Sequence, residues 1–473
     1  MEKELGKAAP CVGACPAGID IPGYIALVGE GRFDDAIRLI RRENPFPGVC
    51  ALVCDHPCEK HCRRNAVDSA VNIRALKRFA AENAGTVLPP GKNPSTGRHV
   101  AVIGSGPSGL TAAYYLALRG HAVTVFEKEK HPGGMLFYGI PSYRLPAQWL
   151  SRDIDAILSL GVELKTETAV GTDITLSDLR KDFDAVYISI GAGADRLPGI
   201  EGENAPGVFS ALGFLRRLAG GETFDFSGKA VAVIGGGNTA MDAVRTSLRL
   251  GAEKVTCAYR RRICDMPALP EEIESAEAEG CRLLPLRAPV RILTDENGAA
   301  SGIVLKPQTL IENGEDRPLP KNSDEPEVVL PADVVIFAVG QAIEDSHFSE
   351  NGVATEHGVF VTDPFSAVPG MEKVFSGGDC ATGPSTVILA VEAGKKAAEA
   401  ISHFLGDFPL PEEAIEIPLP GKPPKGKIPR AEPCRRLIRG SRGNLEQIEE
   451  GLSKESAFAE CKRCLRCDRV WRK

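Results

Sequence analysis

The stretch HVAVIGSGPSGLTAAYYLALRGHAVTVFE, residues 99–127, decides the fold. Its first five residues predict a buried strand, and the glycines after them predict a tight turn. Leu110 to Arg119 have the spacing of a helix, and Val123 to Phe126 predict a second strand. A strand–turn–helix–strand unit is typical of a parallel sheet, so we expect an α/β fold with Rossmann-like domains.

The glycines of this unit form the pattern Gly104-x-Gly106-x-x-Gly109. The first permits the turn, the second lets the backbone approach a pyrophosphate, and the third lets the helix pack on the strand. The N-terminus of the helix presents free N–H groups to phosphates. Glu127 ends the second strand, where a carboxylate suits two ribose hydroxyls. The unit therefore predicts a dinucleotide site.

A second glycine loop lies between a strand at 231–234 and a helix at 239–250; it reads Gly235-Gly-Gly237-Asn238-Thr239. The strand that follows ends in Arg260 and Arg261 instead of a carboxylate. Guanidinium groups pair with a 2′-phosphate that a carboxylate would repel, so we expect NADP(H) here. The alternative is that these arginines form an ordinary solvated turn. Two such units predict one held flavin and one exchanging nicotinamide.

Two later segments suit the flavin, namely residues 131–141 (HPGGMLFYGIP) and residues 374–379 (VFSGGD). Asp379 suits a ribityl hydroxyl, and a helix from about Ser385 can direct its N-terminus at the isoalloxazine. The alternative for both segments is buried core. The nearest cysteines in the middle of the chain are Cys257 and Cys264, beside the second loop, so we do not expect disulfide chemistry at the flavin.

Composition narrows the class of protein further. The net charge of −7 argues against a broad nucleic-acid surface, and no apolar run reaches the roughly 20 residues of a membrane span. The first residues lack the apolar segment of a signal peptide, so we expect a cytoplasmic protein. The chain has 14 cysteines, most of them near its two ends. In a reducing compartment such groups predict metal ligands and not disulfides.

The cysteines near the ends are regularly spaced. They are Cys11, Cys15, Cys50, Cys54, Cys58 and Cys62 at one end and Cys461, Cys464 and Cys467 at the other. Short spacings of this kind wrap [4Fe–4S] cubanes, with zinc as the alternative. Four cationic residues lie in this segment, namely His56, His61, Arg63 and Arg64. Cations near an anionic cluster would raise its reduction potential. The alternative is that these residues form an ordinary polar helix face.

Residues 98–405 resemble the flavin disulfide-reductase-like superfamily, in which an NADP domain interrupts an FAD domain. More narrowly, GGMLFYGIPSYRLP, GGGNTAMDAVRTSLRLGA, YRRRICDMPA and SGGDCATGPSTVILAVEAGKKAA resemble the small (beta) subunit of glutamate synthase. The N-terminal part of dihydropyrimidine dehydrogenase and the NADPH subunits of electron-bifurcating transhydrogenases belong to the same group. The resemblance implies FAD at Gly104, Gly106, Gly109, Glu127, Gly134, Leu136, Gly378 and Asp379, and NADPH at Gly235, Gly237, Asn238, Thr239, Arg260 and Arg261.

The cysteines depart from the resembled family. That family begins with a Cys-x-x-Cys pair, absent here, and uses a Gln ligand at the position of Lys77, whose ammonium cannot bind iron. CKRCLRC near the far end resembles the absent pair, so we expect the tail to fold back and Cys50 to replace the Gln. The expected ligands are Cys11, Cys62, Cys464 and Cys467 for one [4Fe–4S] cluster, and Cys15, Cys50, Cys54 and Cys58 for the other. The roles of Cys434 and Cys461 stay open.

Five segments follow from these patterns. They are a helical iron–sulfur domain at 1–97, an FAD domain at 98–228 and 346–405, an NADP domain at 229–345, and a Pro-rich tether with a cysteine-containing tail at 406–473. Within the first segment, a helix through residues 71–83 is expected to be capped by Asp68 or Ser69.

The expected function is that of an NADPH-dependent FAD and iron–sulfur oxidoreductase subunit. A hydride passes between NADPH and the flavin, and single electrons pass through two clusters to or from a partner redox subunit or a ferredoxin, within a hetero-oligomer. No acid–base residue of the chain is needed. The alternative is a non-catalytic electron-relay or assembly subunit. The final acceptor and the direction of flow stay open.

Overall fold

The computed structural model describes residues 9–312, 314, 317–344, 346–419, 426–433, 445–447 and 449–470.

The first glycine loop follows the first strand of a five-stranded parallel sheet with the order β18-β4-β1-β2-β3. Its strands are β1 (His99–Ile103), β2 (Ala122–Phe126), β3 (Glu163–Lys165), β4 (Ala185–Ile188) and β18 (Val374–Ser376). Val100 and Val102 of β1 pack with apolar residues of α7 (Pro107–Leu118) and α16 (Val387–Leu405) in one core.

The second glycine loop follows a strand of another five-stranded parallel sheet, with the order β6-β14-β7-β8-β9. Its strands are β6 (Val208–Ser210), β7 (Ala230–Ile234), β8 (Lys254–Tyr259), β9 (Arg282–Pro285) and β14 (Val334–Phe337). Its helices are α11 (Ala211–Ala219), α12 (Asn238–Arg249) and α13 (Pro270–Ala278). An antiparallel group adds β10 (Arg287–Thr294), β11 (Ala300–Ile311), β12 (Leu319–Asn322) and β13 (Val328–Pro331).

The two sheets confirm the predicted α/β class with two Rossmann-like domains. Strand β18 lies in the first sheet although it follows the whole second sheet in sequence, so the second domain interrupts the first. Strand β6 pairs with β14 and so belongs to the second sheet, ahead of the boundary at residue 228 that the sequence suggests. The domain bounds themselves stay a prediction.

A helical part precedes the first sheet, as predicted. It contains α1 (Pro10–Gly13), α2 (Ile21–Gly29), α3 (Phe33–Arg41), α4 (Pro47–Val53), α5 (Pro57–Lys60), the 3-10 helix η1 (Arg63–Ala66) and α6 (Ile73–Asn83). The prediction that Asp68 or Ser69 caps α6 is wrong. Asn72 is the cap, and its side chain accepts a hydrogen bond from the Ala75 amide.

Shorter elements connect these parts. They are α8 (Met135–Tyr138), α9 (Ala147–Leu158), α10 (Leu176–Asp182), η2 (Ile263–Asp265), α14 (Ser346–Glu350), α15 (Asp379–Thr382), and the strands β5 (Ala194–Asp195), β15 (Gln341–Ala342), β16 (Thr355–Glu356) and β17 (Val359–Phe360). β5 and β15 pair with each other where the chain crosses between the two domains in both directions. Within the described residues, no helix is both long and apolar enough to cross a membrane.

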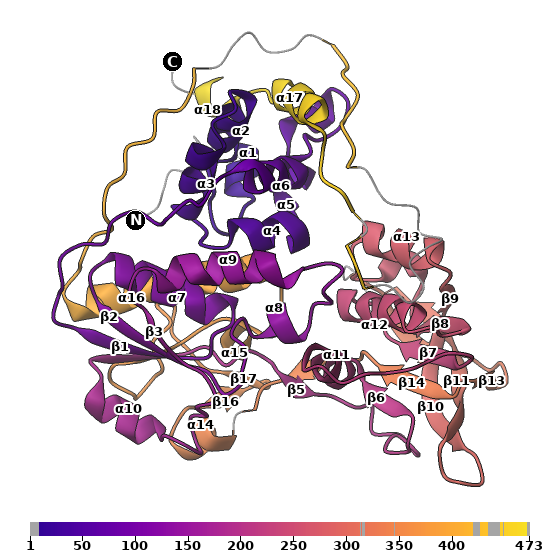
Figure 1. Ribbon diagram of the computed structural model, residues 1–473. Coiled ribbons are helices and arrows are strands. Elements are labelled where there is room, and N and C mark those ends of the chain that lie inside the picture. Colours follow the sequence, from indigo (N-terminus) through magenta and orange to yellow (C-terminus); the bar gives the residue numbers. More distant parts are fainter. Residues whose placement is uncertain are drawn as a thin grey trace.

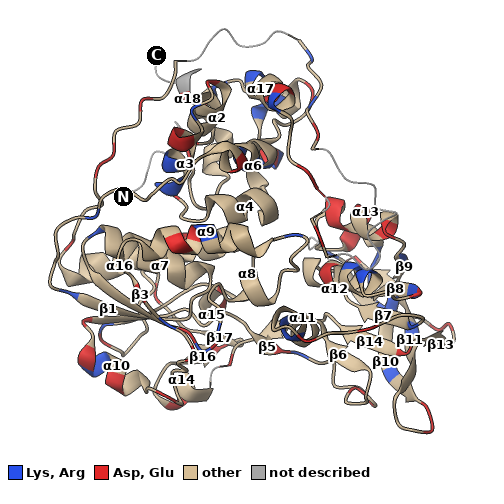
Figure 2. Cartoon of the chain, viewed as in Figure 1, with Lys and Arg blue, Asp and Glu red and all other residues tan. Residues whose placement is uncertain are grey.

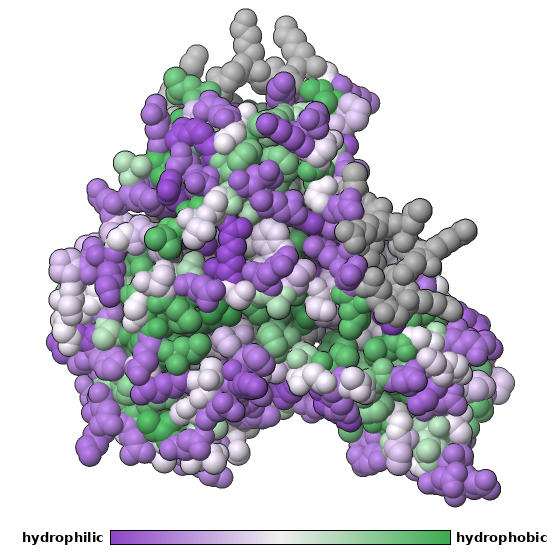
Figure 3. All heavy atoms as spheres, viewed as in Figure 1, coloured by the Kyte–Doolittle hydropathy of each residue, from purple (hydrophilic) through white to green (hydrophobic). Residues whose placement is uncertain are grey.

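The helical part packs on the first Rossmann-like domain, above α9 and α7 (Figure 1). The amide of Val49 in α4 donates to Asp153 in α9 at 2.9 Å, and the Tyr115 hydroxyl of α7 donates to the Arg42 carbonyl at 2.9 Å. Part of α16 stays exposed at Leu389 and Phe404. Figure 3 shows hydrophobic residues in a band across the middle of this face.

The tail returns to the helical part. Residues 407–419 and 426–433 contain no helix or strand, in agreement with the expected extended tether. The tail ends with α17 (Lys454–Lys462) and α18 (Cys467–Val470), and α17 packs against α2 and α6 beside them in Figure 1. The two ends of the described chain therefore lie together.

Candidate active site

A cavity of about 590 Å³ opens at the first glycine loop. Residues from the ends of β1, β2 and β18 line it, together with α8 and the start of α16. Of the residues predicted for FAD, the structure brings seven to this lining: Gly104, Gly106, Glu127, Gly134, Leu136, Gly378 and Asp379. Gly109 is not on the lining. It packs against the loop itself, where a Cβ would come within 2.0 Å of the Gly104 carbonyl oxygen.

Glu127 stabilises the loop and also faces the cavity. Its Oε2 accepts from the Ser105 amide at 2.8 Å and from the Ser105 hydroxyl at 2.5 Å, and its Oε1 accepts from the Glu129 amide at 2.9 Å. The side chain is buried. These bonds hold the carboxylate in one orientation at the cavity wall, which is the arrangement that ribose recognition needs.

Asp379 also lines the cavity, at the start of α15. The Ser385 hydroxyl donates to its Oδ1 at 2.9 Å. Burial raises the pKa of Asp379, and the hydrogen bond from Ser385 opposes that rise. A half-buried acceptor that is already oriented suits a ligand hydroxyl at this position.

The second glycine loop repeats the geometry of the first. Gly104 and Gly235 both have positive φ, +98° and +155°, and a Cβ at either would come within 2.6 Å of a carbonyl oxygen on a neighbouring strand end. Gly237 caps α12, and Asn238 and Thr239 form its first turn. The Asn238 side chain is already used within the protein, because its Oδ1 accepts from the Leu269 amide at 2.9 Å.

The arginines after β8 differ from one another. Arg261 donates to the Pro318 carbonyl at 2.7 Å, and Arg262 pairs with Asp265 at 2.8 Å. Arg260 is exposed. Figure 2 shows basic residues beside β8 and β9. Arg260 is therefore the guanidinium best placed to meet a ligand phosphate, with Arg261 held next to it.

The structure brings four of the predicted iron ligands together from both ends of the chain. Cys11, Cys62, Cys464 and Cys467 line one small cavity. Burial raises the pKa of Cys11 well above its usual value, and the other three thiols reinforce that shift. Thiols this close would repel one another as thiolates unless a cation lay between them.

A buried ion network holds the tail in this position. Glu460 and Arg463, both 0% exposed, pair at 2.6 Å. Arg463 also donates to Asp68 at 3.0 Å and to the Ala70 carbonyl at 3.1 Å, and Glu460 accepts from the Asn72 amide at 2.8 Å. The network therefore joins the residues around the Cys464 turn to the segment before α6. Cys434 lies outside the described residues.

The other four predicted iron ligands, Cys15, Cys50, Cys54 and Cys58, act electrostatically on one side chain, that of Lys77. Each is among the charges that act most strongly on the ammonium of Lys77. Burial opposes the charged form of Lys77, but these thiols outweigh it and raise its pKa. Burial and Cys54 raise the pKa of Cys50 to about 12, whereas Lys77 lowers it.

Helix α13 links the second nucleotide domain to this thiol group. Glu271 in its first turn accepts from His56 at 3.0 Å and pairs with Arg74 at 3.0 Å. Burial opposes ionisation, but His56 and Arg74 lower the pKa of Glu271 to about 2. Both partners contact Cys54, because the His56 amide donates to its Sγ at 3.4 Å and Arg74 donates to its carbonyl at 3.1 Å.

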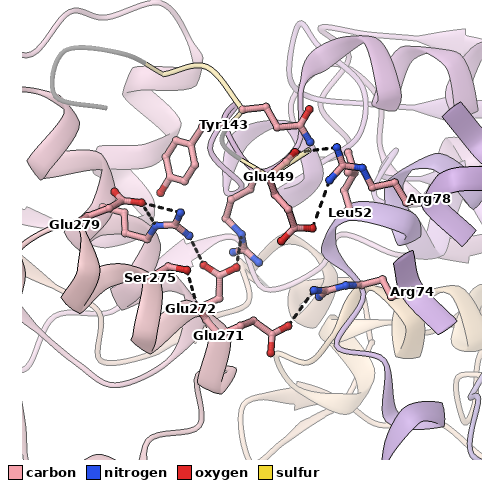
Figure 4. Close-up of a pocket in the computed structure, with 12 residues that line it drawn as sticks. Leu52, Arg74, Arg78, Tyr143, Glu271, Glu272, Ser275, Glu279 and Glu449 are labelled. Carbon is pink, nitrogen blue, oxygen red and sulfur yellow. Dashed lines mark hydrogen bonds and ion pairs between the residues drawn. The ribbon is translucent and has the colours of Figure 1, made fainter. Parts of the chain in front are cut away.

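Figure 4 shows Glu271 and Arg74 beside other ion pairs that line the same pocket. Arg78 of α6 reaches Glu449 of the tail, and Arg245 of α12 pairs with Glu272 of α13 and with Glu279, the C-cap of that helix. Sequence patterns did not reveal this network, because its members come from separate parts of the chain.

The donor sets fit the expected groups. The cavity at the first loop has no cysteine in its lining, and its glycines leave room for a dinucleotide. Each thiol group offers four soft donors, the set that a [4Fe–4S] cube takes. Zinc, the alternative, takes the same thiolate donors as a single tetrahedral ion.

Comparison with known proteins agrees with this geometry. The family model described as pyridine nucleotide-disulphide oxidoreductase matches residues 98–394, and the one described as dihydropyrimidine dehydrogenase domain II, 4Fe-4S cluster, matches residues 5–87. Fold and site thus define an oxidoreductase with FAD, NADP(H) and iron–sulfur binding. The chain belongs to the pyridine nucleotide-disulphide oxidoreductase family.

Curated relatives extend over most of the chain. It is 38% identical to the NADPH-Fe(3+) oxidoreductase subunit beta of Geobacter sulfurreducens, over 98% of this chain and 75% of that protein. It is 35% identical to the glutamate synthase [NADPH] small chain of Escherichia coli (strain K12), over 84% of this chain and 88% of that protein. These relatives confirm the predicted membership in the group of the glutamate synthase small subunit.

A solved structure shows the same fold. Mycobacterium tuberculosis FprA in complex with NADPH superposes with a TM-score of 0.57 at 21% identity, over 66% of this chain and 85% of that chain. At this identity the likeness supports the two-domain Rossmann-like fold alone.

Proposed function

We propose that this chain is the NADPH-linked subunit of a larger redox complex, in which electrons pass between a nicotinamide and a partner subunit or a ferredoxin. The observation that carries the proposal is the packing of the cysteine-rich part on the flavin-type domain. Val49 precedes Cys50 in α4, and its amide is bonded to the buried Asp153 of α9. The named relatives are subunits as well, which supports the existence of a partner.

The chain's residues divide the cofactors among three places. FAD would lie in the cavity of Gly106, Glu127 and Asp379, and NADP(H) at Gly237 and Arg260. Two [4Fe–4S] clusters would be held by the two groups of four thiols described above. When bound, the flavin exchanges a hydride with the nicotinamide and single electrons with the clusters. The protein orients these groups and excludes water, and no side chain has to transfer a proton.

Nucleotide choice tests the role of Arg260. Arg260→Ala should weaken NADPH binding by about 1–3 kcal/mol, the range of a charge-assisted contact, with little change for NADH. Arg261→Ala should act in the same direction. The measurement is kcat/KM for both nucleotides with an artificial acceptor. Arg262→Ala is the matched control, because this guanidinium is already paired with Asp265. Equal losses for both nucleotides would contradict the 2′-phosphate assignment.

Flavin retention tests Asp379. Asp379→Ala should lower the FAD content after gel filtration, because a ligand hydroxyl loses its acceptor. Ser385→Ala removes only the bond that orients this carboxylate, so its loss of FAD should be smaller. Full FAD occupancy in Asp379→Ala would show that the carboxylate does not bind the flavin.

One experiment separates the proposed function from the relay or assembly alternative. The anaerobic protein is mixed with NADPH, and the flavin absorbance and the cluster EPR signals are followed. We expect both the flavin and the clusters to be reduced. Reduction by dithionite but not by NADPH would support the non-catalytic relay. Iron and sulfide analysis distinguishes both the NADPH-linked subunit and the non-catalytic relay from a zinc-containing flavin reductase.

A further inference from the structure

One wall of the cavity that the tail completes is charged. This tail cavity is the one lined by the thiols of Cys11, Cys62, Cys464 and Cys467. Among the described residues that line it, Arg63 and Arg64 are the only charged ones, and the side chains other than these and the thiols are apolar. Arg63 is exposed, whereas Arg64 is 0% exposed. Arg64 is therefore the guanidinium that the protein shields from solvent at this cavity.

One edge of the Arg64 guanidinium is fixed. Its Nε and Nη2 donate to the two carboxylate oxygens of Asp68 at 2.7 Å and 2.6 Å, and Nη2 also donates to the Gly426 carbonyl of the tether at 3.0 Å. Asp68 is held in turn by Arg463 of the tail at 3.0 Å and by the Ile428 amide at 2.9 Å. Since Nε and Nη2 share one edge of the planar group, Nη1 is directed away from Asp68.

The remaining nitrogen of Arg64 has no acceptor. Its Nη1 is buried and makes no hydrogen bond within the part of the chain that the structure describes. Arginine nitrogens can only donate, and a buried charged donor without an acceptor is destabilising. The apolar side chains of the tail cavity offer none. Sulfur atoms of an anionic cluster would accept such a bond, so the free donor fits a cluster in this cavity.

We propose that Nη1 of Arg64 donates a hydrogen bond to a sulfur of the iron–sulfur cluster in the tail cavity, and so raises the reduction potential of that cluster. The inference rests on the proposed function, because it requires the cluster. One electron, which NADPH supplies through the flavin, adds one negative charge to a group that four thiolates already make anionic. A charged N–H donor at its sulfur stabilises that added charge. The guanidinium keeps its proton throughout, so the effect does not depend on a titration.

The first test is a dithionite titration of the full-length protein followed by EPR. The signal that is lost when Cys464 and Cys467 are replaced by serine identifies the cluster of the tail cavity. Arg64→Met removes the charge and the donor, and we expect it to lower the midpoint potential of that cluster and leave the other unchanged. Arg64→Lys keeps the charge without the fork of donors and should lower it less. Arg63→Met is the matched control, and its shift should be smaller than that of Arg64→Met because Arg63 is exposed.

The second test detects the hydrogen bond in the wild-type protein. The arginines are labelled with nitrogen-15 in their guanidinium groups, and pulsed EPR is recorded on the reduced cluster of the tail cavity. We expect a nitrogen-15 coupling in this signal. The coupling should persist in Arg63→Lys and disappear in Arg64→Lys.

The outcomes separate this inference from the function on which it rests. Wild-type protein without iron and sulfide would contradict the proposed function itself. With iron and sulfide present, two unchanged midpoints in Arg64→Met would overturn the role of Arg64 alone, and so would an equal shift in Arg63→Met. If the Arg64 variants lose their iron, the labelled protein decides. A coupling that persists in Arg63→Lys supports the hydrogen bond, and the absence of any coupling overturns it.

Discussion

Replacing Cys464 and Cys467 together by serine should remove one of two iron–sulfur clusters and leave the flavin in place. These residues provide two of the four thiols in the cavity that also contains Cys11 and Cys62. A cube held by two thiolates instead of four would not persist. The iron content should fall from about eight to about four per chain, with one EPR signal lost. FAD content should not change, because the cavity at Gly106 contains no tail residue.

Cys461→Ser is the control for this experiment. Cys461 belongs to the same tail segment but does not line the cavity. Its replacement should keep the full iron content. Truncation after Pro429 should have the same effect as the double variant, since it also removes Arg463 and Glu460. Unchanged iron in the double variant would refute ligation by the tail.

Gly106→Val should abolish FAD binding while the protein stays folded. A Cβ at Gly106 meets no protein atom within 4 Å, and the backbone φ of −68° suits any residue. The added side chain therefore projects into the cavity, where the pyrophosphate is expected. The measurement is flavin absorbance per chain, with circular dichroism to verify folding.

Gly109→Val provides the contrast. There a Cβ would come within 2.0 Å of the Gly104 carbonyl oxygen, so this variant should lose its structure along with FAD. Full FAD in Gly106→Val would mean that the first glycine loop does not bind the flavin.

Local patterns predicted much of the fold. Strand β1 was expected at the residues where it occurs, and α12 begins within a residue of its predicted start, at Asn238. Both depend on periodicity and glycine chemistry within about ten residues. The cap of α6 was predicted wrongly because the Asp68 carboxylate pairs with Arg64 and Arg463 instead of capping the helix. Arg463 is distant in sequence. A long-range ion pair overrode a local preference.

Some parts of the candidate site were predicted from the sequence and others were not, because some of its contacts join residues that are distant in sequence. The glycine loops were found from spacing alone, and the tail was placed beside Cys11 by the resemblance to a family. Sequence reasoning looked for cluster cations at His56, His61, Arg63 and Arg64. Arg63 and Arg64 do line the cavity that contains Cys11 and Cys62. Arg64 also pairs with Asp68, and His56 with Glu271. Lys77 was considered only as a failed ligand, because nothing in its local sequence reveals that its side chain is buried.

The position of the tail has a consequence for biosynthesis. The thiols of Cys15, Cys50, Cys54 and Cys58 all lie within the first 58 residues of the chain, so that group is complete while the ribosome is still making the Rossmann-like domains. The group around Cys11 is incomplete until Cys467 has emerged, almost a full chain later. Under the proposed ligation, the first group could take up its cluster while later parts of the chain are still being made, and the second could not do so before Cys467 has been made.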